Sequence, residues 1–475
     1  MISDRPKTKI VCTLGPSTSS EETIEALVRS GMSIARLNLS HGTEPEHVTA
    51  LECVRRVSDR LGLPVGIMVD VPGAKYRTGP LNTSVLDLDN GDVLTLTSRD
   101  VIGTRTTVAV SPPGIHRDAT VGRPVLLDDG RIELLVDEVD GEDVSCTVVR
   151  GGRLTERRGV ATPGKAPSQP FPDAVATRAI QFAVEHGVDM VALSTVTSEA
   201  DVMAAREIVD RGGHDLQVVS KIERKEAIDS FDDILRVSDA VMVARGDMGV
   251  EVRLARVPVI QKDLIARSNA SGKPVITATQ MLESMVALPV PTRAEVTDVA
   301  NAIFDGTDAI MLSGETSVGR YPVEAVKVMA EVAIEAEAAL PYDRMIVEKR
   351  RDLVPLTDDA ISYDACQTAH QLGASLIVAF TESGSTAGRV SKYRPKAPIL
   401  ALTDNEAVQR RLTMRWGVIP VTIPRIESVD GFFAIGERIA RQQAGLPPGS
   451  LIVLVAGLPV GVKGSTNLLR VLTIT

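Results

Sequence analysis

The chain has 475 residues, enough for two or three domains. Its formal net charge is −10, and aromatic residues make up only 3% of the sequence. Both values argue against a nucleic-acid-binding protein, which needs basic surfaces and aromatic side chains for stacking. No apolar run reaches the roughly 18 residues of a membrane span, and the N-terminus lacks a signal-peptide pattern. The four cysteines are scattered singly, which is typical of buried, reduced thiols in a cytoplasmic protein.

Short apolar runs alternate with helical patterns in the first 70 residues and again after residue 168. Three runs before the break suit buried strands: Lys7–Leu14, Ser33–Leu37 and Val65–Val69. Five further strand and helix pairs follow the break, and the last helix is expected from Pro322 to about Ala339. Eight alternating units predict a closed (β/α)₈ barrel, an α/β fold made by residues 1–70 and 168–340.

Two regions depart from this alternation. Residues 71–167 contain only short β-type runs separated by turn signals, with no helical period, which predicts an all-β domain inserted after the third strand. The exit of this insert, TPGKAPSQPFP, is rich in proline and suits a hinge. Residues 341–475 begin with a link up to Leu356 and then alternate again, which predicts a C-terminal α/β domain. Asp358 and Asp359 are interpreted as charges that cap its first helix.

Two neighbouring strands of the predicted barrel lead into charged residues. The first leads into Lys221 and Glu223, and the second, Ala240–Ala244, leads into Asp247. Residues two apart in a strand face the same way, so Lys221 and Glu223 can share one site that Asp247 reaches from the next strand. Carboxylates beside cationic groups are typical of a divalent-metal site that binds an anionic ligand. Salt bridges at the strand ends are the plainer alternative.

Polar residues also follow other strands. Arg36, Asn38, Ser40 and His41 cluster after the second strand, and this mixture suits a phosphate-bearing ligand. Thr279 adds a hydroxyl at another strand end, although such hydroxyls often only cap helices. A hydroxyl-rich turn between a strand and a helix of the C-terminal domain can hold a phosphate, and a plain helix cap explains it about equally well. This turn contains Thr381, Ser383, Gly384, Ser385 and Thr386.

Several long motifs, in their order along nearly the whole chain, resemble those of pyruvate kinases. They are TKIVCTLGP, ARLNLSHG, VARGDMGVE, KPVITATQMLESM, PTRAEVTDVANAIFDGTDAIMLSGET and SKYRPKAPI. The chain is similar to the short bacterial form without an extra C-terminal domain. The resemblance implies transfer of the phosphoryl group of phosphoenolpyruvate to ADP, giving pyruvate and ATP in the last step of glycolysis. It also implies Mg²⁺ or Mn²⁺ as cofactor, a phosphorylated allosteric effector and a cytoplasmic homotetramer.

The resemblance implies roles for individual residues. The divalent-metal ligands would be Glu223 and Asp247. Catalysis would depend on Lys221, Arg36, Thr279 and Ser313. The substrate would contact Arg36, Lys221, Gly246, Asp247 and Thr279. The nucleotide would contact Asn38, His41, Arg77 and Asp129. A monovalent cation would lie among Asn38, Ser40, Asp70 and the carbonyl of Val71. The effector would bind the turn Thr381–Thr386.

Some positions depart from the family pattern. Lys75 stands where potassium-dependent members carry a glutamate, so we expect its ammonium group to replace the monovalent cation and K⁺ not to be required. Ala74, Ala161, Thr195 and Glu46 also differ from the usual residues and lie near the nucleotide side. They motivate an alternative, a divergent paralogue that uses the same metal and 2-oxoacid site for aldol cleavage or pyruvyl transfer. A catalytically silent binding protein is a third hypothesis, disfavoured by the intact metal and phosphate residues.

Overall fold

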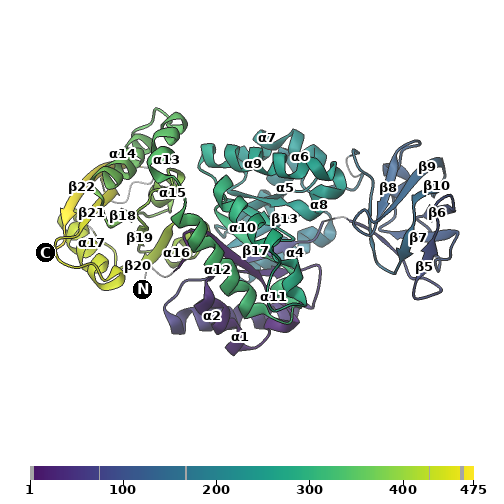
Figure 1. Ribbon diagram of the computed structural model, residues 1–475, viewed down its shortest axis with the longest axis horizontal. Coiled ribbons are helices and arrows are strands. Elements are labelled where there is room, and N and C mark those ends of the chain that lie inside the picture. Colours follow the sequence, from purple (N-terminus) through teal and green to yellow (C-terminus); the bar gives the residue numbers. More distant parts are fainter. Residues whose placement is uncertain (1–4, 74, 166–167, 427, 460–464) are drawn as a thin grey trace.

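The computed structural model describes residues 5–73, 75–165, 168–426, 428–459 and 465–475. The chain forms three bodies in a row: a central barrel, a β domain at one end and an α/β domain at the other (Figure 1). No helix in these described ranges is long and apolar enough to cross a membrane.

The central body is a closed barrel of eight parallel strands in the order β1-β17-β16-β15-β14-β13-β3-β2. The strands are β1 (Lys9–Thr13), β2 (Met32–Asn38), β3 (Gly66–Val71), β13 (Met190–Leu193), β14 (Gln217–Ile222), β15 (Ala240–Ala244), β16 (Val275–Ala278) and β17 (Ala309–Leu312). Their side chains are almost all buried, because the helices cover the outside and packed layers fill the inside. The predicted (β/α)₈ barrel is confirmed.

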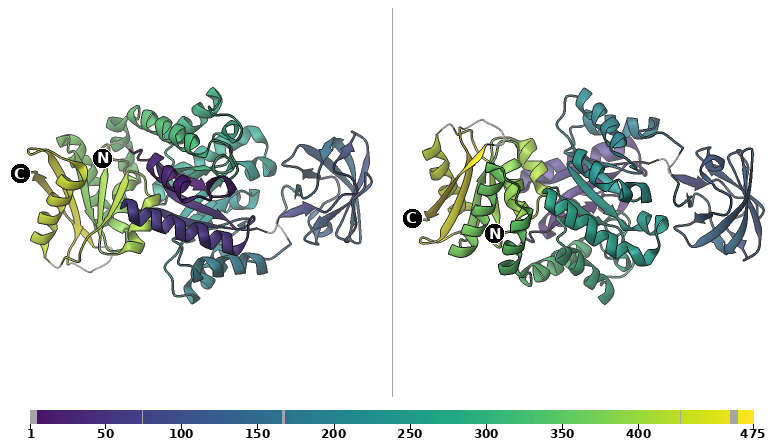
Figure 2. Two further views of the ribbon diagram at one scale, coloured as in Figure 1. Left: turned by 90° about the horizontal axis from the view of Figure 1, so that it is seen from below. Right: turned by 90° about the horizontal axis from the view of Figure 1, so that it is seen from above.

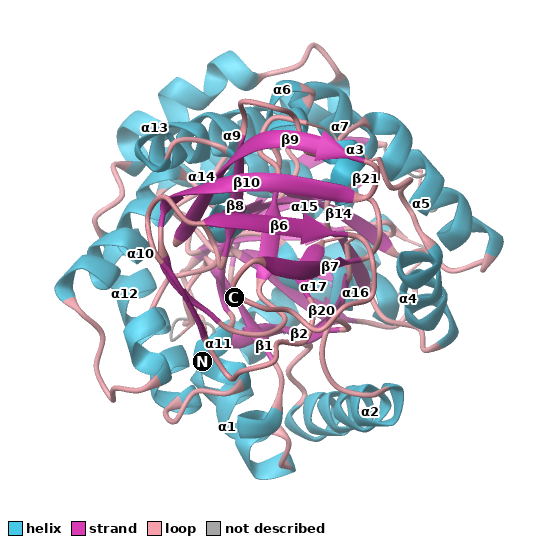
Figure 3. Cartoon of the chain, turned by 90° about the vertical axis from the view of Figure 1, so that its right-hand side faces the viewer, coloured by secondary structure: helices cyan, strands magenta, loops and turns pink. Residues whose placement is uncertain are grey.

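Helices surround the barrel, and Figure 3 shows many of them as a ring around the strands. They are α1 (Glu21–Ser30), α2 (Glu44–Leu61), α4 (Ala174–Glu185), α5 (Glu199–Arg211), α6 (Lys225–Asp229), α7 (Phe231–Val237), α8 (Arg245–Glu251), α9 (Val257–Ser271), α10 (Arg293–Asp305), α11 (Gly314–Ser317) and α12 (Pro322–Ala338). Side-chain caps fix several starts: Ser20 accepts from the Thr23 N–H at 3.2 Å, and Asp173 accepts from the Ala176 N–H at 2.7 Å. These caps fix the residue at which each of these two helices begins.

The inserted domain, called the lid here, comprises the strands from β4 to β12. Seven of them close a second barrel in the order β10-β6-β7-β4-β12-β8-β9, and β11 pairs with β5. They are β4 (Tyr76–Thr78), β5 (Leu86–Leu88), β6 (Val93–Thr97), β7 (Thr107–Ser111), β8 (Pro124–Leu127), β9 (Ile132–Asp140), β10 (Asp143–Arg150), β11 (Gly152–Leu154) and β12 (Gly159–Ala161). The sequence pattern predicts no helix here and misses α3 (Ile115–Asp118), a single turn too short to show a period.

The C-terminal body has a five-stranded sheet in the order β20-β19-β18-β21-β22, with only β22 antiparallel. Its strands are β18 (Leu376–Phe380), β19 (Ile399–Thr403), β20 (Val418–Thr422), β21 (Leu451–Gly457) and β22 (Thr466–Thr473). Its helices are α13 (Tyr342–Glu348), α14 (Thr357–Leu372), α15 (Ser385–Lys392), α16 (Glu406–Arg411) and α17 (Val429–Ala444). The prediction of a plain link before Leu356 is wrong, because Ile346 is buried and anchors α13.

The C-terminal body closes the end of the barrel opposite the lid (Figure 2). Arg394 enters this end and donates to the carboxylate of Asp308 at 2.8 Å and to the side chain of Asn269 at 2.7 Å. Lys9 at the start of β1 donates to the carbonyl of Val418 at 2.7 Å. Because Arg394 and Asp308 are both nearly inaccessible to solvent, this junction is a buried charged contact.

Candidate active site at the barrel mouth

Charged side chains from three strands meet inside the barrel mouth. Arg36, at the end of β2, donates from Nε to Asp70 on β3 at 2.8 Å and from Nη1 to the Thr13 hydroxyl at 2.8 Å. Lys221 on β14 donates to Asp70 at 3.2 Å and to the Ser194 hydroxyl at 2.6 Å. All five side chains are buried. Such a network is stable only because every charge faces an opposite one.

The charge state of this network follows from its geometry. Burial alone raises the pKa of Asp70, but the positive charges of Arg36 and Lys221 outweigh it and lower that pKa to about 2. Asp70 is therefore ionised throughout the neutral range and holds two cations in place. The two cations remain available on their other sides for an anion in the mouth.

The two predicted metal ligands lie next to this network. The Glu223 carboxylate is 3.6 Å from the Lys221 ammonium, and one of its oxygens accepts the Thr195 N–H at 2.6 Å. Its other oxygen, Oε2, is buried without a hydrogen-bond partner. Asp247, in the first turn of α8, lies on the same side, because the Lys75 ammonium is 2.5 Å from Asp247 and 3.9 Å from Glu223.

These residues fit a divalent cation. Mg²⁺ binds through one or two carboxylates and completes its shell with water and substrate oxygens. Among the residues that the structure describes, no group of three or more His, Cys, Asp or Glu side chains forms a metal cluster. Burial raises the pKa of Asp247, but Lys75 and then Lys221 outweigh it and hold that pKa below its usual value. Glu223 Oε2 accepts no hydrogen bond but faces two ammonium groups, Lys221 at 3.6 Å and Lys75 at 3.9 Å.

The next strand end brings Thr279 to the same wall. Its hydroxyl accepts the Gly246 N–H at 2.8 Å, so two of the five residues predicted to contact substrate are in direct contact. Thr279 has a φ of 70° and Thr195 a φ of 58°, both in the left-handed region. β-branched residues rarely adopt this conformation, and such strain of about 1–3 kcal/mol is typical of functional sites.

The remaining predicted residues are at the rim of the mouth. Asn38 caps the turn after β2, where its side chain accepts the Ser40 N–H at 3.2 Å, and His41 is exposed just beyond. Val71 is buried at the end of β3. Ser313 follows β17, and its N–H donates to Glu315 at 2.7 Å. In the part of the chain that the structure describes, none of these side chains forms a hydrogen bond with the side chains of the buried network.

The lid faces the mouth across a cavity of about 220 Å³. The barrel wall includes Glu223 and Asp247, and the lid wall includes Arg77 and Asp129. The lid wall also carries Arg157 and Arg158, which the sequence analysis does not single out. Arg157 has a φ of 58°, in the left-handed region. Such a backbone conformation often marks a functional residue, but it cannot be recognised from the sequence.

The structure shows the local surroundings of three of the four residues near the nucleotide side that depart from the family pattern. Glu46 is exposed and caps α2, where it accepts the Thr43 N–H at 2.7 Å. Ala161 lines the cavity between lid and barrel. Thr195 packs directly against Gly73, where a Cβ atom would lie 2.4 Å from a Thr195 methyl group. Ala74 lies outside the described residues.

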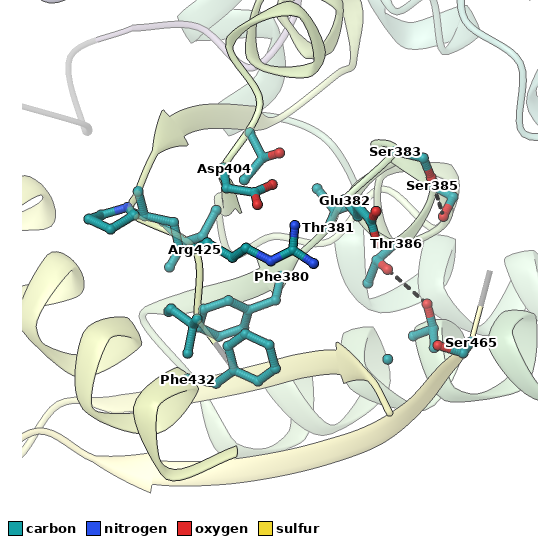
Figure 4. A pocket seen from close by; sticks show the side chains of 17 residues that line it. Phe380, Thr381, Glu382, Ser383, Ser385, Thr386, Asp404, Arg425, Phe432 and Ser465 are labelled. Atoms are coloured by element: carbon teal, nitrogen blue, oxygen red, sulfur yellow. Dashed lines mark hydrogen bonds between the residues drawn. The ribbon is translucent and has the colours of Figure 1, made fainter. Parts of the chain in front are cut away.

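A second pocket lies in the C-terminal body, at the predicted effector turn. Its volume is about 90 Å³, and it is lined by the hydroxyl-bearing residues Thr381, Ser383, Ser385 and Thr386. Gly384, with a φ of 90°, starts helix α15 without a side-chain cap, so the first N–H groups of that helix remain open to a ligand. The Thr381 hydroxyl is buried and lacks a hydrogen-bond partner. Figure 4 shows the Arg425 side chain reaching across this pocket beside Asp404.

Comparisons with known proteins agree with this geometry. The family model described as "Pyruvate kinase, barrel domain" matches residues 5–326, and "Pyruvate kinase, alpha/beta domain" matches residues 359–472. The chain belongs to the pyruvate kinase family. It is 43% identical to the pyruvate kinase of Clostridium acetobutylicum over 98% of this chain and 99% of that one. It is also 43% identical to a pyruvate kinase of Staphylococcus aureus over 98% of this chain and 80% of that one.

A solved structure extends the comparison. The crystal structure of a pyruvate kinase from Cryptosporidium parvum superposes with a TM-score of 0.93 at 34% identity. It covers 100% of this chain and 97% of that one. The protein is therefore a phosphotransferase with the three-body fold of this family, and no comparison favours the aldolase or pyruvyl-transfer alternative.

Proposed function

We propose that the protein transfers the phosphoryl group of phosphoenolpyruvate to ADP, giving pyruvate and ATP. One observation carries this proposal: buried Arg36 and Lys221 share Asp70, and the carboxylates of Glu223 and Asp247 lie beside them around the Lys75 ammonium. Phosphoryl transfer needs positioned positive charge more than it needs covalent chemistry. The mouth supplies that charge from rigid strands.

In the proposed mechanism each group has a positional role. Arg36 binds the phosphate of phosphoenolpyruvate, and Lys221 faces the phosphoryl group in transit and the enolate oxygen left behind. Gly246 and Thr279 orient the substrate carboxylate, and Ser313 lies near the proton path to the enolate carbon. Glu223 and Asp247 would hold Mg²⁺ or Mn²⁺, which neutralises charge on the reacting oxygens when bound.

The lid would complete the site around the nucleotide. Arg77 and Asp129 already face the barrel across the cavity, and closing that cavity would exclude water and prevent hydrolysis. Asn38 and His41 at the barrel rim would contact the nucleotide from the other side. Arg157 and Arg158 add positive charge on the lid wall where a polyphosphate would lie.

The monovalent cation is the point at which this chain departs from potassium-dependent relatives. Burial lowers the pKa of Lys75, but Glu223 and then Asp247 outweigh it and raise that pKa above its usual value. Lys75 is therefore a permanent positive charge at the mouth. We propose that it makes K⁺ unnecessary at the site formed by Asn38, Ser40, Asp70 and Val71.

The C-terminal pocket suits a phosphorylated effector, bound by the hydroxyls and open N–H groups of the turn Thr381–Thr386. A cytoplasmic homotetramer is proposed from the family resemblance.

A coupled assay tests the function directly. Purified protein with Mg²⁺, phosphoenolpyruvate and ADP is expected to release pyruvate and ATP in equal amounts, and omitting ADP should stop pyruvate release. Release of pyruvate without ADP, or no release while phosphoenolpyruvate still raises the melting temperature, would contradict the proposal.

A further inference from the structure

The segment that leaves the lid contacts a side chain of the barrel. Arg224 donates from Nη2 to the carbonyl of Lys165 at 3.0 Å, just after the turn that follows β12. The carboxylate of Glu251 lies 3.6 Å from Arg224, so the two side chains form one unit, called the hinge clamp here. Through Arg224 the hinge clamp contacts the backbone where the lid ends.

The hinge clamp is attached to both predicted metal ligands. Arg224 directly follows Glu223 in the chain, and Glu251 lies one helical turn after Asp247 on α8. Residues four apart in a helix lie on the same face, so Asp247 and Glu251 point to the same side. A displacement of the segment that leaves the lid would therefore shift the chain segments that carry the Glu223 and Asp247 carboxylates.

The hinge clamp is buried but incompletely satisfied. The side chains of Arg224 and Glu251 are only 14% and 6% exposed. Nε of Arg224, Oε2 of Glu251 and Oε2 of the neighbouring Glu226 nevertheless lack hydrogen-bond partners. Nε of Arg224 and Oε2 of Glu226 face each other at 3.6 Å, an ion pair too long for a hydrogen bond, and buried polar atoms without hydrogen bonds are costly. Arg224 and Glu251 also line the cavity between lid and barrel, so the strain lies where the lid must move.

We propose that Arg224, with Glu251, is a positioning residue for phosphoryl transfer that sets where the lid stands relative to the metal carboxylates. It contacts no reacting atom. It acts through the Lys165 carbonyl and so determines how the lid residues that face the nucleotide approach the mouth. This role rests on the proposed reaction, but lid position itself can be measured without turnover.

Lid position is measured by electron–electron double resonance between spin labels. Val93→Cys on the lid and Met203→Cys on α5 place labels at exposed sites, and all four native cysteines are buried. Arg224→Ala is expected to broaden the lid-to-barrel distance distribution. Arg224→Lys should keep it narrower, because lysine can still donate to the carbonyl. The control is Arg153→Ala, which removes an arginine that is 77% exposed and absent from the cavity wall.

The kinetic constants for ADP and for phosphoenolpyruvate should respond differently, in line with the change in lid position. Arg224→Ala should lower kcat about tenfold and raise the KM for ADP, with little change in the KM for phosphoenolpyruvate, because misplacing a group by about 1 Å costs up to 100-fold. Arg224→Lys should recover part of this loss. Unchanged distances and an unchanged KM for ADP in Arg224→Ala would overturn the proposal. If Arg224→Ala instead lowers the melting temperature and impairs kcat and both KM values equally, and Arg224→Lys restores none of them, the role of Arg224 is merely structural and the proposal is wrong.

Discussion

The barrel mouth and the C-terminal pocket both lie where parallel strands end, yet they are built from different groups. At the mouth, Arg36, Asp70 and Lys221 are buried and form ion pairs with one another before any ligand arrives. The C-terminal pocket instead offers hydroxyls, open N–H groups at α15, and Arg425 close to Asp404. Its charges are not locked into a buried network.

This difference fits the two tasks proposed above, phosphoryl transfer at the mouth and effector binding at the C-terminal pocket. A group that stabilises charge moving between atoms must be fixed in a water-poor site, because reorganising it during the reaction costs free energy. A regulatory ligand must bind and leave, which favours neutral donors and a helix N-terminus over buried ion pairs. The two sites should therefore respond very differently to the loss of one side chain.

The largest effect is expected at the mouth. Lys221→Met should lower kcat by about 10³, the scale for losing a preorganised charge in a closed site. The coupled pyruvate assay measures it. Lys225→Met is the matched control, because Lys225 is exposed on the next helix and pairs only with Asp229. Equal losses of kcat in both variants, or a loss below tenfold for Lys221→Met, would show that the mouth does not depend on the fixed charge of Lys221.

The next effect concerns the fixed charge at position 75. Lys75→Glu replaces the ammonium by the carboxylate of potassium-dependent relatives. Its rate is expected to rise several-fold with added KCl, because the mouth then lacks one positive charge. The wild-type rate should change little over the same titration. A strong activation of the wild-type protein by KCl would show that Lys75 does not replace the cation.

At the C-terminal pocket a single change should matter less. Thr381→Val removes an unpartnered buried hydroxyl while keeping the shape, so the fold should tolerate it. The ratio of rates with and without a phosphorylated ligand should fall towards one, measured with a hexose monophosphate, a hexose bisphosphate and a nucleoside monophosphate in turn. Thr422→Val, just outside the pocket, serves as control. If activation persists fully in Thr381→Val, the turn is not the effector site.

The smallest effect is on stability and depends on pH. Burial raises the pKa of Glu251 to about 7, with Arg224 opposing the shift. Because the folded state then binds a proton more tightly than the unfolded state, this group destabilises the fold as pH rises from about 4.5 to 7. Glu251→Gln should therefore gain melting temperature relative to wild type across that window. A difference that is constant with pH would refute this.

Much of the fold could be predicted because the strands and helices obey simple periods. Lys221 and Glu223 were placed together by their spacing of two in one strand, and their charged atoms do lie 3.6 Å apart. The contact between Lys75 and Asp247 could not be predicted, because 172 residues separate them. The contact of Ser194 with Lys221 was also missed. Ser194 follows a predicted strand, as the other site residues do, but a single hydroxyl at a strand end is too common to indicate a site.

Asp359 shows a different kind of failure. In the sequence it is interpreted as a capping charge in the first turn of a helix. In the structure it is buried, accepts the Tyr393 hydroxyl at 2.7 Å and lies 3.1 Å from the Lys392 ammonium. These partners come from the end of α15, so the tertiary fold overrode a local rule. Asp358, its neighbour, pairs with Arg389 at 2.7 Å.

The buried junction around Arg394 has a consequence for how the molecule comes apart. Unfolding either the barrel or the C-terminal body alone would break the buried Arg394–Asp308 ion pair and expose the junction to water. The barrel and the C-terminal body should therefore melt as one cooperative unit. The lid is joined to the barrel by two connecting segments and has its own core, so it can melt separately. In calorimetry, the molecule would behave as two bodies rather than three.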